Sequence, residues 1–381
     1  MDDAPDRFFI GLMSGTSLDG VDGVLVDLSK QKPQVAVHRS ALFAPELRAE
    51  LLALNTRGDD ELHRAAQAAN ALAQRYADVV AELLAAAGIA ANQVAAIGAH
   101  GQTVRHHPRP FDAPRPDASP LPGYTLQLNN PALLAELTGI TVVADFRSRD
   151  VAAGGEGAPL VPAFHREVFG EPGRDVAVLN LGGIANLSLL FADGGVRGFD
   201  CGPGNALIDG WCQRHTGHAF DAGGAWAASG RVDPALLGAL LAEPFLAAPP
   251  PKSTGRDLFN MEWLQARLQG FAALPAADVQ ATLAEFTARC AADALSLQGA
   301  DSCTLIVCGG GALNTHLMQR LQAGLPLVAV TSSEAHGLPP LQVEAAAFAW
   351  LARKTLRREP GNLPGVTGAR GPRVLGAIHP A

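Results

Sequence analysis

The sequence predicts an α/β protein that is long enough for two domains of ordinary size. Apolar strand patterns alternate with helical patterns along all 381 residues, which is typical of this class. Hydrophobic residues make up 48% of the chain and charged residues 17%, so the chain can bury a sizeable core. Three glycine clusters follow predicted strands, and they indicate where a ligand contacts the backbone.

The strands and helices are placed in chain order by their apolar spacing. Strands are predicted at Phe8–Met13, Val24–Leu28, Val94–Ala99, Thr125–Leu128, Thr141–Ala144, Val176–Leu181, Leu187–Phe191, Thr304–Cys308 and Leu327–Val330. The longest helix is predicted at Glu61–Ala87, where apolar residues recur at helical spacing. Further helices are predicted at Pro131–Leu137, Ala206–His215, Ala281–Leu297, Ala312–Leu321 and Val343–Leu356.

Two irregular stretches interrupt this order. Residues 147–162 are rich in glycine, alanine and charge, as hinge and site loops often are, so we predict the domain boundary there. The first domain then covers residues 1–147 and the second covers 148–381, with a final segment able to pack back on the first. Residues 107–123 hold six prolines and predict an exposed loop, either a tolerated insertion or a lid.

Charge and composition exclude several classes of partner. A net charge of −8 argues against nucleic acid and anionic membranes, which favour a basic face. No apolar stretch approaches the roughly 20 residues that span a bilayer, and the acidic start MDDAPDR is unlike a secretory signal. The five cysteines form neither a paired framework nor a zinc pattern, so we expect buried, reduced thiols in a cytoplasmic protein.

The first glycine cluster, MSGTSLDG, carries more chemistry than a strand reversal needs. Glycine lets the backbone approach an anion closely, and its N–H groups then point at phosphate oxygens. The predicted phosphate contacts are Gly15, Thr16, Ser17, Leu18, Asp19, Gly20, Val21 and Asp22. Two of these residues, Asp19 and Asp22, are also candidates for holding hydrated Mg²⁺.

The other two clusters are NLGGIANLS and VCGGGALN. The first contributes Gly182 and Gly183 as predicted phosphate contacts. The second contributes Gly309, Gly310, Gly311 and Asn314, where a base or ribose can lie against a helix start. A single glycine-rich turn is usually only a turn, so the prediction depends on all three. Neither GxxxxGK nor GxGxxG is present, which excludes the P-loop and the dinucleotide fingerprint.

The order and character of these clusters resemble the actin-like ATPase and sugar-kinase superfamily. The resemblance implies two actin-like (ribonuclease H-like) domains with a cleft between them, and ATP with Mg²⁺ as cofactors. It identifies the first two clusters as phosphate loops and the third as the adenosine loop. Many members carry an acid in the first strand, where this chain has Leu12 and Met13.

A narrower resemblance covers nearly the whole chain. The segments GLMSGTSLDGVD, GAHGQTVRHHP, RDVAAGGEGAPLVP, GFDCGPGN, PPKSTGRDLFN and CGGGALN together resemble the anhydro-N-acetylmuramic acid kinase family. The resemblance implies ATP-dependent phosphorylation of 1,6-anhydro-N-acetylmuramic acid, with water opening the anhydro ring, on the route that recycles cell-wall peptidoglycan. It also implies a homodimer. The proline-rich stretch at 108–122 is longer than the family usually shows.

This chemistry needs a carboxylate that accepts a proton from the attacking water. By resemblance, Asp200 in GFDCGPGN aligns with the general base, and the alternative is a cap on the following helix. The predicted sugar contacts are His100, Gln102, Thr103, Arg149, Asp150 and Glu344. Each has a structural alternative. His100 is alternatively a buried core histidine, and Arg149 and Asp150 are alternatively a surface ion pair. Glu344 is alternatively a first-turn acid that favours the helix dipole.

Two other functions are compatible with the same motifs. One is a kinase for another sugar or for a carboxylate in the same superfamily. The other is a non-catalytic, nucleotide-dependent scaffold of actin-like build. GFDCGPGN together with HGQTVRH favours the anhydro sugar. The segment PKSTGRDLFN, from Pro251, resembles a family motif, and the sequence alone gives it no chemical role.

Overall fold

A computed structural model describes residues 7–15, 18–30, 32–111, 121–255, 258–299 and 303–381. The chain divides into two compact units, one formed by Met1–Val168 with Leu341–Ala381 and the other by Phe169–Pro340. The boundary between the units thus follows Val168, whereas we placed the domain boundary after Arg147. Within the described ranges, every helix is too short or too polar to span a bilayer.

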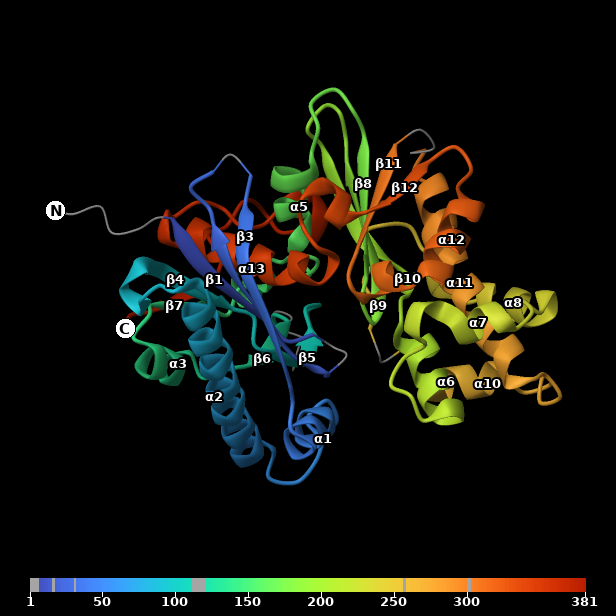
Figure 1. Cartoon of the computed structure of the whole chain (residues 1–381), viewed down its shortest axis with the longest axis horizontal. Coiled ribbons are helices and arrows are strands. Elements are labelled where there is room, and N and C mark those ends of the chain that lie inside the picture. The colour runs from blue at the N-terminus through green and yellow to red at the C-terminus, as the bar shows by residue number, and fades with distance from the viewer. Residues whose placement is uncertain (1–6, 16–17, 31, 112–120, 256–257, 300–302) are drawn as a thin grey trace, which may run out of the picture. The chain divides into compact units, whose positions relative to one another are not determined.

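Unit 1 is built on a six-stranded sheet with the order β13-β7-β4-β1-β2-β3 (Figure 1). Its strands are β1 (Phe8–Met13), β2 (Gly20–Asp27), β3 (Gln34–Leu42), β4 (Val94–Ala99), β7 (Val142–Ala144) and β13 (Ala377–His379). Strands β1, β2 and β3 pair antiparallel, whereas β4 runs parallel to both β1 and β7. The final strand β13 pairs with β7, which explains why the end of the chain belongs to this unit.

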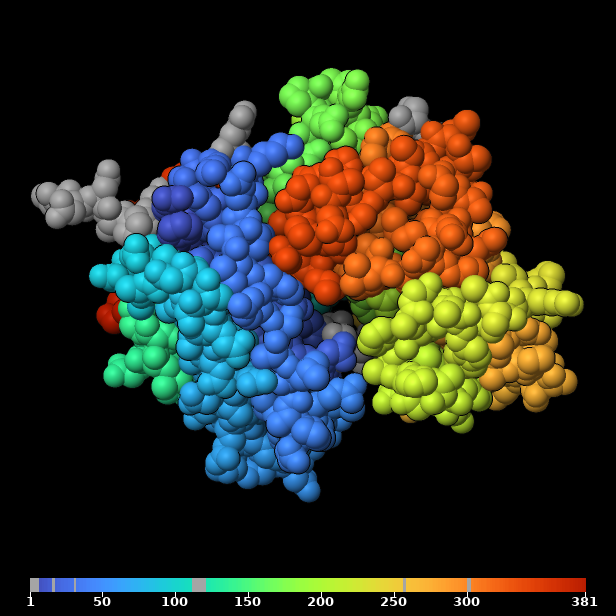
Figure 2. All heavy atoms as spheres, viewed as in Figure 1, coloured from blue at the N-terminus to red at the C-terminus, as the bar shows by residue number. Residues whose placement is uncertain are grey.

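The helices of unit 1 lie on both faces of this sheet. They are α1 (Pro45–Ala53), α2 (Glu61–Ala87), η1 (Ala91–Gln93), α3 (Pro131–Thr138), α4 (Ser148–Ala152), α5 (Val161–Phe169), η5 (Pro340–Gln342), α13 (Val343–Leu356) and α14 (Pro364–Thr367). One core cluster joins Leu72 and Val79 of α2 to Ile10 and Leu25 of the sheet. Polar side chains of α2 lie at the molecular surface, where Figure 2 shows this helix.

Helix α13 packs on the other face of the sheet, and glycine makes this contact possible. A Cβ built on Gly11 of β1 would overlap the carbonyl oxygen of Ala345, and one built on Gly98 of β4 would overlap that of Phe348. The helix backbone therefore lies directly on the strand backbones. This contact brings the first turns of α13 close to the ends of β1 and β4.

Unit 2 repeats the same sheet topology with the order β10-β9-β8-β11-β12. Its strands are β8 (Val176–Leu181), β9 (Ile184–Leu190), β10 (Val196–Pro203), β11 (Thr304–Cys308) and β12 (Ala329–Ser332). The first three pair antiparallel, and β11 runs parallel to β8 and β12. The chain thus contains one α/β topology twice, which confirms the predicted fold class.

Two hydrophobic clusters form the core of unit 2. Its helices are α6 (Ala206–Thr216), η2 (Ala222–Gly224), α7 (Ala225–Ser229), α8 (Pro234–Leu241), α9 (Pro244–Ala247), α10 (Met261–Arg267), α11 (Ala276–Ser296), η3 (Gly310–Leu313), α12 (Thr315–Gly324) and η4 (Ser333–His336). One cluster packs α11 and α12 on the sheet, with Leu295 and Leu321 against Leu179 and Leu305. The other joins α6, α8 and α10 to α11 through residues such as Phe286.

The structure confirms the main predicted elements and corrects several others. Phe8–Met13, Glu61–Ala87 and Val343–Leu356 have the predicted bounds. Strand β3 was not predicted, because its alternating apolar residues lie on an edge strand with much exposed surface. It was wrong to treat the whole of 147–162 as a loop, because Ser148–Ala152 forms α4 and α5 begins at Val161.

A hairpin of β5 (Gln102–His107) and β6 (Tyr124–Leu128) stands apart from the main sheet of unit 1. The predicted proline-rich loop lies between these strands, and residues 112–120 of it are outside the described residues. Phe111 and Leu121 at its two ends form an isolated antiparallel bridge. Both side chains are exposed, as predicted for this stretch.

The contact of α13 with the sheet generates the first prediction. The variant Gly98→Ala forces the helix backbone away from β4, so we expect its free energy of unfolding to fall by about 2–3 kcal/mol. Chemical denaturation of the purified variant measures this change. The control is Gly58→Ala, where only the flexible end of the Arg64 side chain approaches the new methyl group. Equal stability of the two variants would contradict the close backbone contact.

Candidate functional site

The turn between β1 and β2 is the first predicted phosphate loop. Thr16 and Ser17 lie outside the described residues, whereas Gly15 and Leu18 are described. Leu18 has a φ of 59°, and its N–H donates to the carbonyl oxygen of Gly15 at 3.2 Å. The same oxygen accepts from Nε2 of Gln102 at 3.2 Å. The backbone of this turn is therefore held by a residue that we also predicted as a ligand contact.

A buried hydroxyl network fixes the start of the same turn. Ser14 Oγ lies 2.9 Å from the hydroxyl of Tyr76 on α2 and donates to the carbonyl oxygen of Gly101 at 3.0 Å. The N–H of Gly101 in turn donates to the Tyr76 hydroxyl at 3.2 Å. Burial raises the pKa of Tyr76, so the phenol stays protonated. Three segments that are distant in sequence are thereby locked together at the end of β1.

The two acids of the first loop differ in their surroundings. Asp19 is exposed in the turn. Asp22 lies on β2, where its carboxylate accepts from Ser40 Oγ and lies 3.2 Å from Nε2 of His38 on β3. Among the described residues, no group of three or more His, Cys, Asp or Glu side chains could hold a metal ion by itself. Mg²⁺ commonly takes only one or two carboxylates together with phosphate oxygens, and the exposed Asp19 is compatible with that role.

Three predicted loop residues have mainly packing contacts. Gly20 starts β2 and lies so close to Ala41 of β3 that a Cβ would overlap its carbonyl oxygen. Val21 is buried in the core on the α2 face. Leu18 is also buried, and its carbonyl oxygen accepts from Arg48 at 3.1 Å. The side chains of Leu18 and Val21 therefore anchor the loop, and only their backbone groups remain as candidates for phosphate.

His100 follows β4 and is buried beside the first loop. The backbone N–H of His100 donates to the carbonyl oxygen of Leu12 at 3.0 Å. Its Nε2 lies 3.1 Å from Nε and 2.9 Å from Nη2 of Arg147, which identifies Nε2 as the acceptor of a neutral ring. Burial, with the charge of Arg147 as a second cause, lowers the pKa of His100 to about 3. Arg147 also donates to the carbonyl oxygen of Gly157 at 2.8 Å.

The hairpin of β5 and β6 carries polar atoms that lack partners. Gln127 lies opposite Thr103 and donates to its hydroxyl at 3.2 Å. Oε1 of Gln127 and both side-chain polar atoms of Asn129 are buried without a hydrogen-bond partner in the described part of the chain. On the other strand, Oε1 of Gln102 is in the same state. Such groups cost about 1–3 kcal/mol each when unsatisfied, so hydroxyl-rich ligands or water are the expected partners.

Arg149 and Asp150 are adjacent on α4 but have different environments. Arg149 is exposed and lines a cavity of about 150 Å³ together with Arg370 and Arg373. Asp150 is fully buried, and its carboxylate accepts from Asn362 at 2.7 Å, Thr367 at 2.8 Å and the N–H of Gly157 at 2.8 Å. Asp150 thus joins the glycine-rich loop to the C-terminal segment, whereas Arg149 is accessible to an anion.

Glu344 lies in the first turn of α13. Phe348 is one helical turn further on, and its ring contacts that of His100 with centroids 4.7 Å apart. Residues four apart share one side of a helix, so Glu344 lies on the side of α13 that faces His100. The structure therefore brings together Gly15, Gln102 and His100 directly, and places Glu344 on the same side.

In unit 2 the second predicted phosphate loop is a two-residue hairpin. Gly182 and Gly183 connect β8 to β9, and paired glycines are typical of such tight turns. The carbonyl oxygen of Gly182 accepts from the N–H of Asn205 at 2.7 Å, and that of Gly183 accepts from Gly204 at 3.0 Å. A Cβ on Gly204 would overlap the carbonyl oxygen of Gly182. The hairpin turn therefore lies directly on the start of α6.

The third glycine cluster packs on the end of β8. Gly309 has a φ of 77°, and a Cβ there would lie 2.8 Å from the carbonyl carbon of Leu181. Gly311 approaches the Leu181 side chain, whereas a Cβ on Gly310 would make only an ordinary contact, 3.6 Å from Nδ2 of Asn205. Asn314 caps α12, because its Oδ1 accepts from the N–H of Leu317 at 3.0 Å. The cluster places bare backbone beside Asn205 and the second loop, and Asn314 supports the helix that follows.

Asp200 lies on β10, opposite Asn186 of β9, where the register shifts by one residue before Gly202. Its side chain does not cap α6. Oδ2 accepts from Ser253 Oγ at 3.0 Å and from the N–H of Thr254 at 2.9 Å. Asp200 is 9% exposed, so the carboxylate is nearly enclosed but reachable. A carboxylate held in this way can accept a proton in a defined direction.

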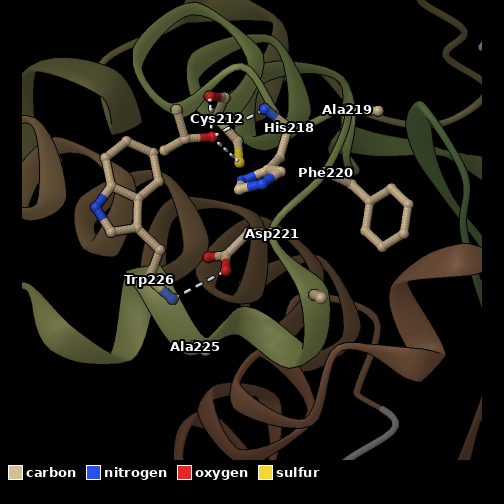
Figure 3. Close-up of a pocket in the computed structure, with 9 residues that line it drawn as sticks. Cys212, His218, Ala219, Phe220, Asp221, Ala225 and Trp226 are labelled. Atoms are coloured by element: carbon tan, nitrogen blue, oxygen red, sulfur yellow. Dashed lines mark hydrogen bonds between the residues drawn. The ribbon is translucent and has the colours of Figure 1, made fainter.

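A cavity in unit 2 lies away from the predicted site residues. It has a volume of about 420 Å³ and is lined by Cys212, Thr216, His218, Ala219, Phe220, Asp221, Ala222, Ala225 and Trp226 (Figure 3). It lies at the C-terminal end of α6, whereas the second phosphate loop contacts the first residues of that helix. The Asp221 carboxylate in its wall is engaged by the N–H groups of Trp226 and Ala227. None of the predicted site residues lines this cavity.

Several contributors to the site were missed in the sequence. Arg147, Gln127 and Asn129 had no motif spacing of their own, and only the fold brings them to His100 and Thr103. Ser253 and Thr254 did carry a signal, because they belong to the segment PKSTGRDLFN that was singled out without a role. Tyr76 has the spacing of a core residue, and its buried hydroxyl contact is a purely tertiary feature.

Sequence comparisons find relatives over nearly the whole chain. A sequence profile described as anhydro-N-acetylmuramic acid kinase matches residues 7–381. A protein of that name from Variovorax paradoxus is 66% identical over 381 residues, which cover 98% of this chain and 99% of that protein. Another from Albidiferax ferrireducens is 60% identical over 393 residues, with coverage of 98% and 99%.

Solved structures match at much lower identity. The activator of the 2-hydroxyisocaproyl-CoA dehydratase from Clostridium difficile, with bound ADPNP, is 11% identical with a TM-score of 0.48, and the match covers 92% of this chain and 96% of that one. A ROK family glucokinase from Streptomyces griseus, in complex with glucose and AMPPNP, is 16% identical with a TM-score of 0.42 and coverage of 91% and 99%. The family assignment therefore rests on the sequence matches.

The environment of His100 generates a pH prediction. Below pH 6.5 the unfolded chain protonates this ring, but the native protein does so only near pH 3. His100 therefore contributes stability that is present above pH 6.5 and is lost as the pH falls toward 3. In His100→Gln the free energy of unfolding should fall less steeply between pH 6 and 4, by up to about 1.4 kcal/mol per pH unit.

Denaturant titrations of both proteins at several pH values measure this difference. His165 has its pKa lowered to about 3 by burial and is retained in both proteins, so its contribution cancels in the comparison. The same pH dependence in wild type and variant would show that His100 is not held neutral by the fold.

Proposed function

Because the chain belongs to the anhydro-N-acetylmuramic acid kinase family, we propose that it uses ATP to phosphorylate 1,6-anhydro-N-acetylmuramic acid while water opens the anhydro ring. The products are N-acetylmuramic acid 6-phosphate and ADP, as in peptidoglycan recycling. The alternatives, a kinase for another substrate and a non-catalytic scaffold, are not favoured, because near full-length relatives at 60–66% identity share one name.

The reaction couples two substitutions, one at the anomeric carbon and one at the γ-phosphorus. Water attacks the anomeric carbon, the bond from that carbon to the 6-oxygen breaks, and one proton of the water passes to a base. The 6-oxygen attacks the γ-phosphorus, and the bond to the β-phosphate oxygen breaks to release ADP. The departing 6-oxygen needs no acid, because phosphoryl transfer consumes its developing charge. The protein must therefore supply one base, a phosphate cradle and a sugar site.

Asp200 is the proposed base, and its held carboxylate is the observation that carries the proposal. Two donors fix Oδ2, and the nearly enclosed position limits competing solvent. Asp200 is on β10, which ends at Pro203, and the next residue, Gly204, lies against the Gly182–Gly183 turn. A base and a phosphate loop on neighbouring strands suit a reaction in which a sugar bond opens as a phosphoryl group is transferred.

The glycine loops are the proposed nucleotide site. Their bare backbone at Gly15, Gly182–Gly183 and Gly309–Gly311 offers N–H groups to phosphates and a flat surface to adenosine. Asp19 is the candidate for Mg²⁺, through water, and Asp22 is a weaker one because its carboxylate is engaged by Ser40. When bound, Mg²⁺ would neutralise phosphate charge.

The sugar site is proposed around the β5–β6 hairpin and His100. Thr103, Gln127 and Asn129 present polar atoms to a hydroxyl- and amide-rich ligand. The neutral His100 holds Arg147 in place, and the exposed Arg149 suits the lactyl carboxylate, because guanidinium and carboxylate are both planar. Asp150 acts on this region as a positioning residue through the glycine-rich loop.

Two further features are proposed on separate grounds. The five cysteines are buried and form no disulfide in the part of the chain that the structure describes, which supports a reducing, cytoplasmic location. The homodimer rests on the family resemblance alone, and sedimentation at micromolar concentration would measure it directly.

The proposed base is tested by isotope labelling together with mutation. Reaction in ¹⁸O-water should place label on the anomeric oxygen and none in the newly formed phosphate ester. Asp200→Asn keeps the shape of the side chain but cannot accept the proton, so turnover should fall by about 10²–10⁴-fold. Binding of ATP and sugar, measured by calorimetry, should persist. Ring opening without ATP, or near-normal turnover of the variant, would contradict the coupled mechanism.

The sugar site is tested on the hairpin. Gln127→Ala and Asn129→Ala each remove a side chain with unsatisfied buried polar atoms, so the KM for the anhydro sugar should rise about three- to tenfold. The KM for ATP should be unchanged. Leu126→Ala is the matched control, because Leu126 is exposed on the other face of the same strand. Equal effects of all three substitutions on both substrates would remove the hairpin from the site.

A further inference from the structure

The segment PKSTGRDLFN contacts Asp200 through three consecutive residues. The N–H of Asp200 donates to the carbonyl oxygen of Lys252 at 3.1 Å. Ser253 Oγ and the N–H of Thr254 both donate to Oδ2 of Asp200, at 3.0 and 2.9 Å. The backbone and the side chain of one residue are thus bound by the same short segment. We refer to Lys252–Thr254 as the clamp.

The Lys252 side chain anchors the clamp to helix α9. Its Nζ donates to the carbonyl oxygens of Phe245 at 3.1 Å and Leu246 at 2.9 Å. It also lies 4.8 Å from the centroid of the Phe245 ring, a favourable cation–π position. These contacts occupy the ammonium group with the end of α9. Lys252 therefore fixes the first residue of the clamp, and the next two residues bind the Asp200 carboxylate.

We propose that Ser253 is a positioning residue for the base, and that the clamp holds the Asp200 carboxylate in the orientation that accepts a proton from the attacking water. The inference rests on the proposed function, in which Asp200 is that base. It assigns a role to a motif that the sequence alone left without one. Ser253 acts through Asp200.

The chemical reason is the geometry of proton transfer. A general base must lie within about 2.6–3.2 Å of the proton donor with a lone pair aimed at it. A free Asp side chain rotates about two bonds, and two donors on one oxygen remove that freedom. Hydrogen bonds to the charged form also stabilise the carboxylate and keep it ionised. The clamp therefore provides orientation and the correct protonation state together.

The charges around the clamp favour a simple pH readout. Lys252 is a cation within the clamp, and burial lowers its pKa, with opposing contributions from Cys201, Cys290 and Asp200. Burial, with the charge of Asp200 as a second cause, raises the pKa of Cys201 to about 12, and burial raises that of Cys290 well above its ordinary value. Both thiols are therefore neutral between pH 4 and 8. The two thiols therefore do not contribute to the acid limb of a pH–rate profile.

The test compares Ser253→Thr with Ser253→Val. These side chains have the same shape and differ in a hydroxyl against a methyl group, so their comparison isolates the hydrogen bond. We expect Ser253→Thr to retain most of the wild-type kcat, and Ser253→Val to lose about 10- to 100-fold in kcat, with the KM for ATP unchanged. Ser253→Ala gives the same comparison without added bulk. Ser296→Ala, an exposed serine on α11, is the control for hydroxyl removal in the same unit.

The pH profile of kcat separates positioning from a merely structural role. The base works only when ionised, so activity falls as the pH falls through its pKa. Loss of a donated hydrogen bond raises that pKa, and the acid limb should move upward by about one pH unit in Ser253→Val and Ser253→Ala. In Ser253→Thr it should stay at the wild-type position.

Each outcome has a definite meaning. A loss of kcat with an upward shift, recovered by Ser253→Thr, supports the proposal. Wild-type kcat and profile in Ser253→Ala and Ser253→Val would overturn it, and so would an equal loss in all three variants without a shift. If Asp200→Asn is itself fully active, the proposed base is wrong, whatever the Ser253 variants do. If the Ser253 variants overturn the role of the clamp but Asp200→Asn is inactive, the proposed function still stands.

Discussion

The absence of a Cβ at particular glycines is the constraint on which the rest of this structure depends. In unit 1, Gly11 and Gly98 let the backbone of α13 lie on β1 and β4. In unit 2, Gly204 lets the start of α6 lie on the Gly182–Gly183 turn. Both contacts are backbone to backbone, so no side-chain repacking can absorb a substitution. The same lack of side chains leaves amide groups available to a phosphate.

A second feature is that two buried carboxylates among the predicted site residues, Asp150 and Asp200, are held by neutral donors in the contacts described. Asp150 is fully buried, yet it has no cationic partner in the contacts described; an amide, a hydroxyl and a backbone N–H donate to it. Asp200 is held by a hydroxyl and an N–H. Such contacts orient a group without neutralising it, which leaves its charge available for a ligand.

The sequence predicted the parts of this protein that local chemistry decides. Phe8–Met13 and Glu61–Ala87 have strong apolar periodicity, and the structure has them at the predicted bounds. The glycine clusters were found because conformational freedom is a property of single residues. The sequence could not show that Arg147, and not Arg149, contacts His100, because the two arginines of one segment differ only in the direction in which the fold places their side chains. Ser253 could not be joined to Asp200, because the contact spans 53 positions of sequence.

The position of Asp200 follows from how strand β10 is held. The register shift between Asp200 and Gly202 is a bulge, and bulges re-aim the side chains beside them. A Cβ on Gly202 would lie 2.8 Å from that of Cys290, so the strand is pressed on α11 at this point. Two residues after Gly202, Gly204 packs directly against the Gly182–Gly183 turn. The four steps from Asp200 to Gly204 cover at most about 13 Å of extended chain. Strand β10, fixed by Gly202 and by Gly204 just beyond its end, thereby sets the distance along the chain between the proposed base and the turn that we propose as a phosphate loop.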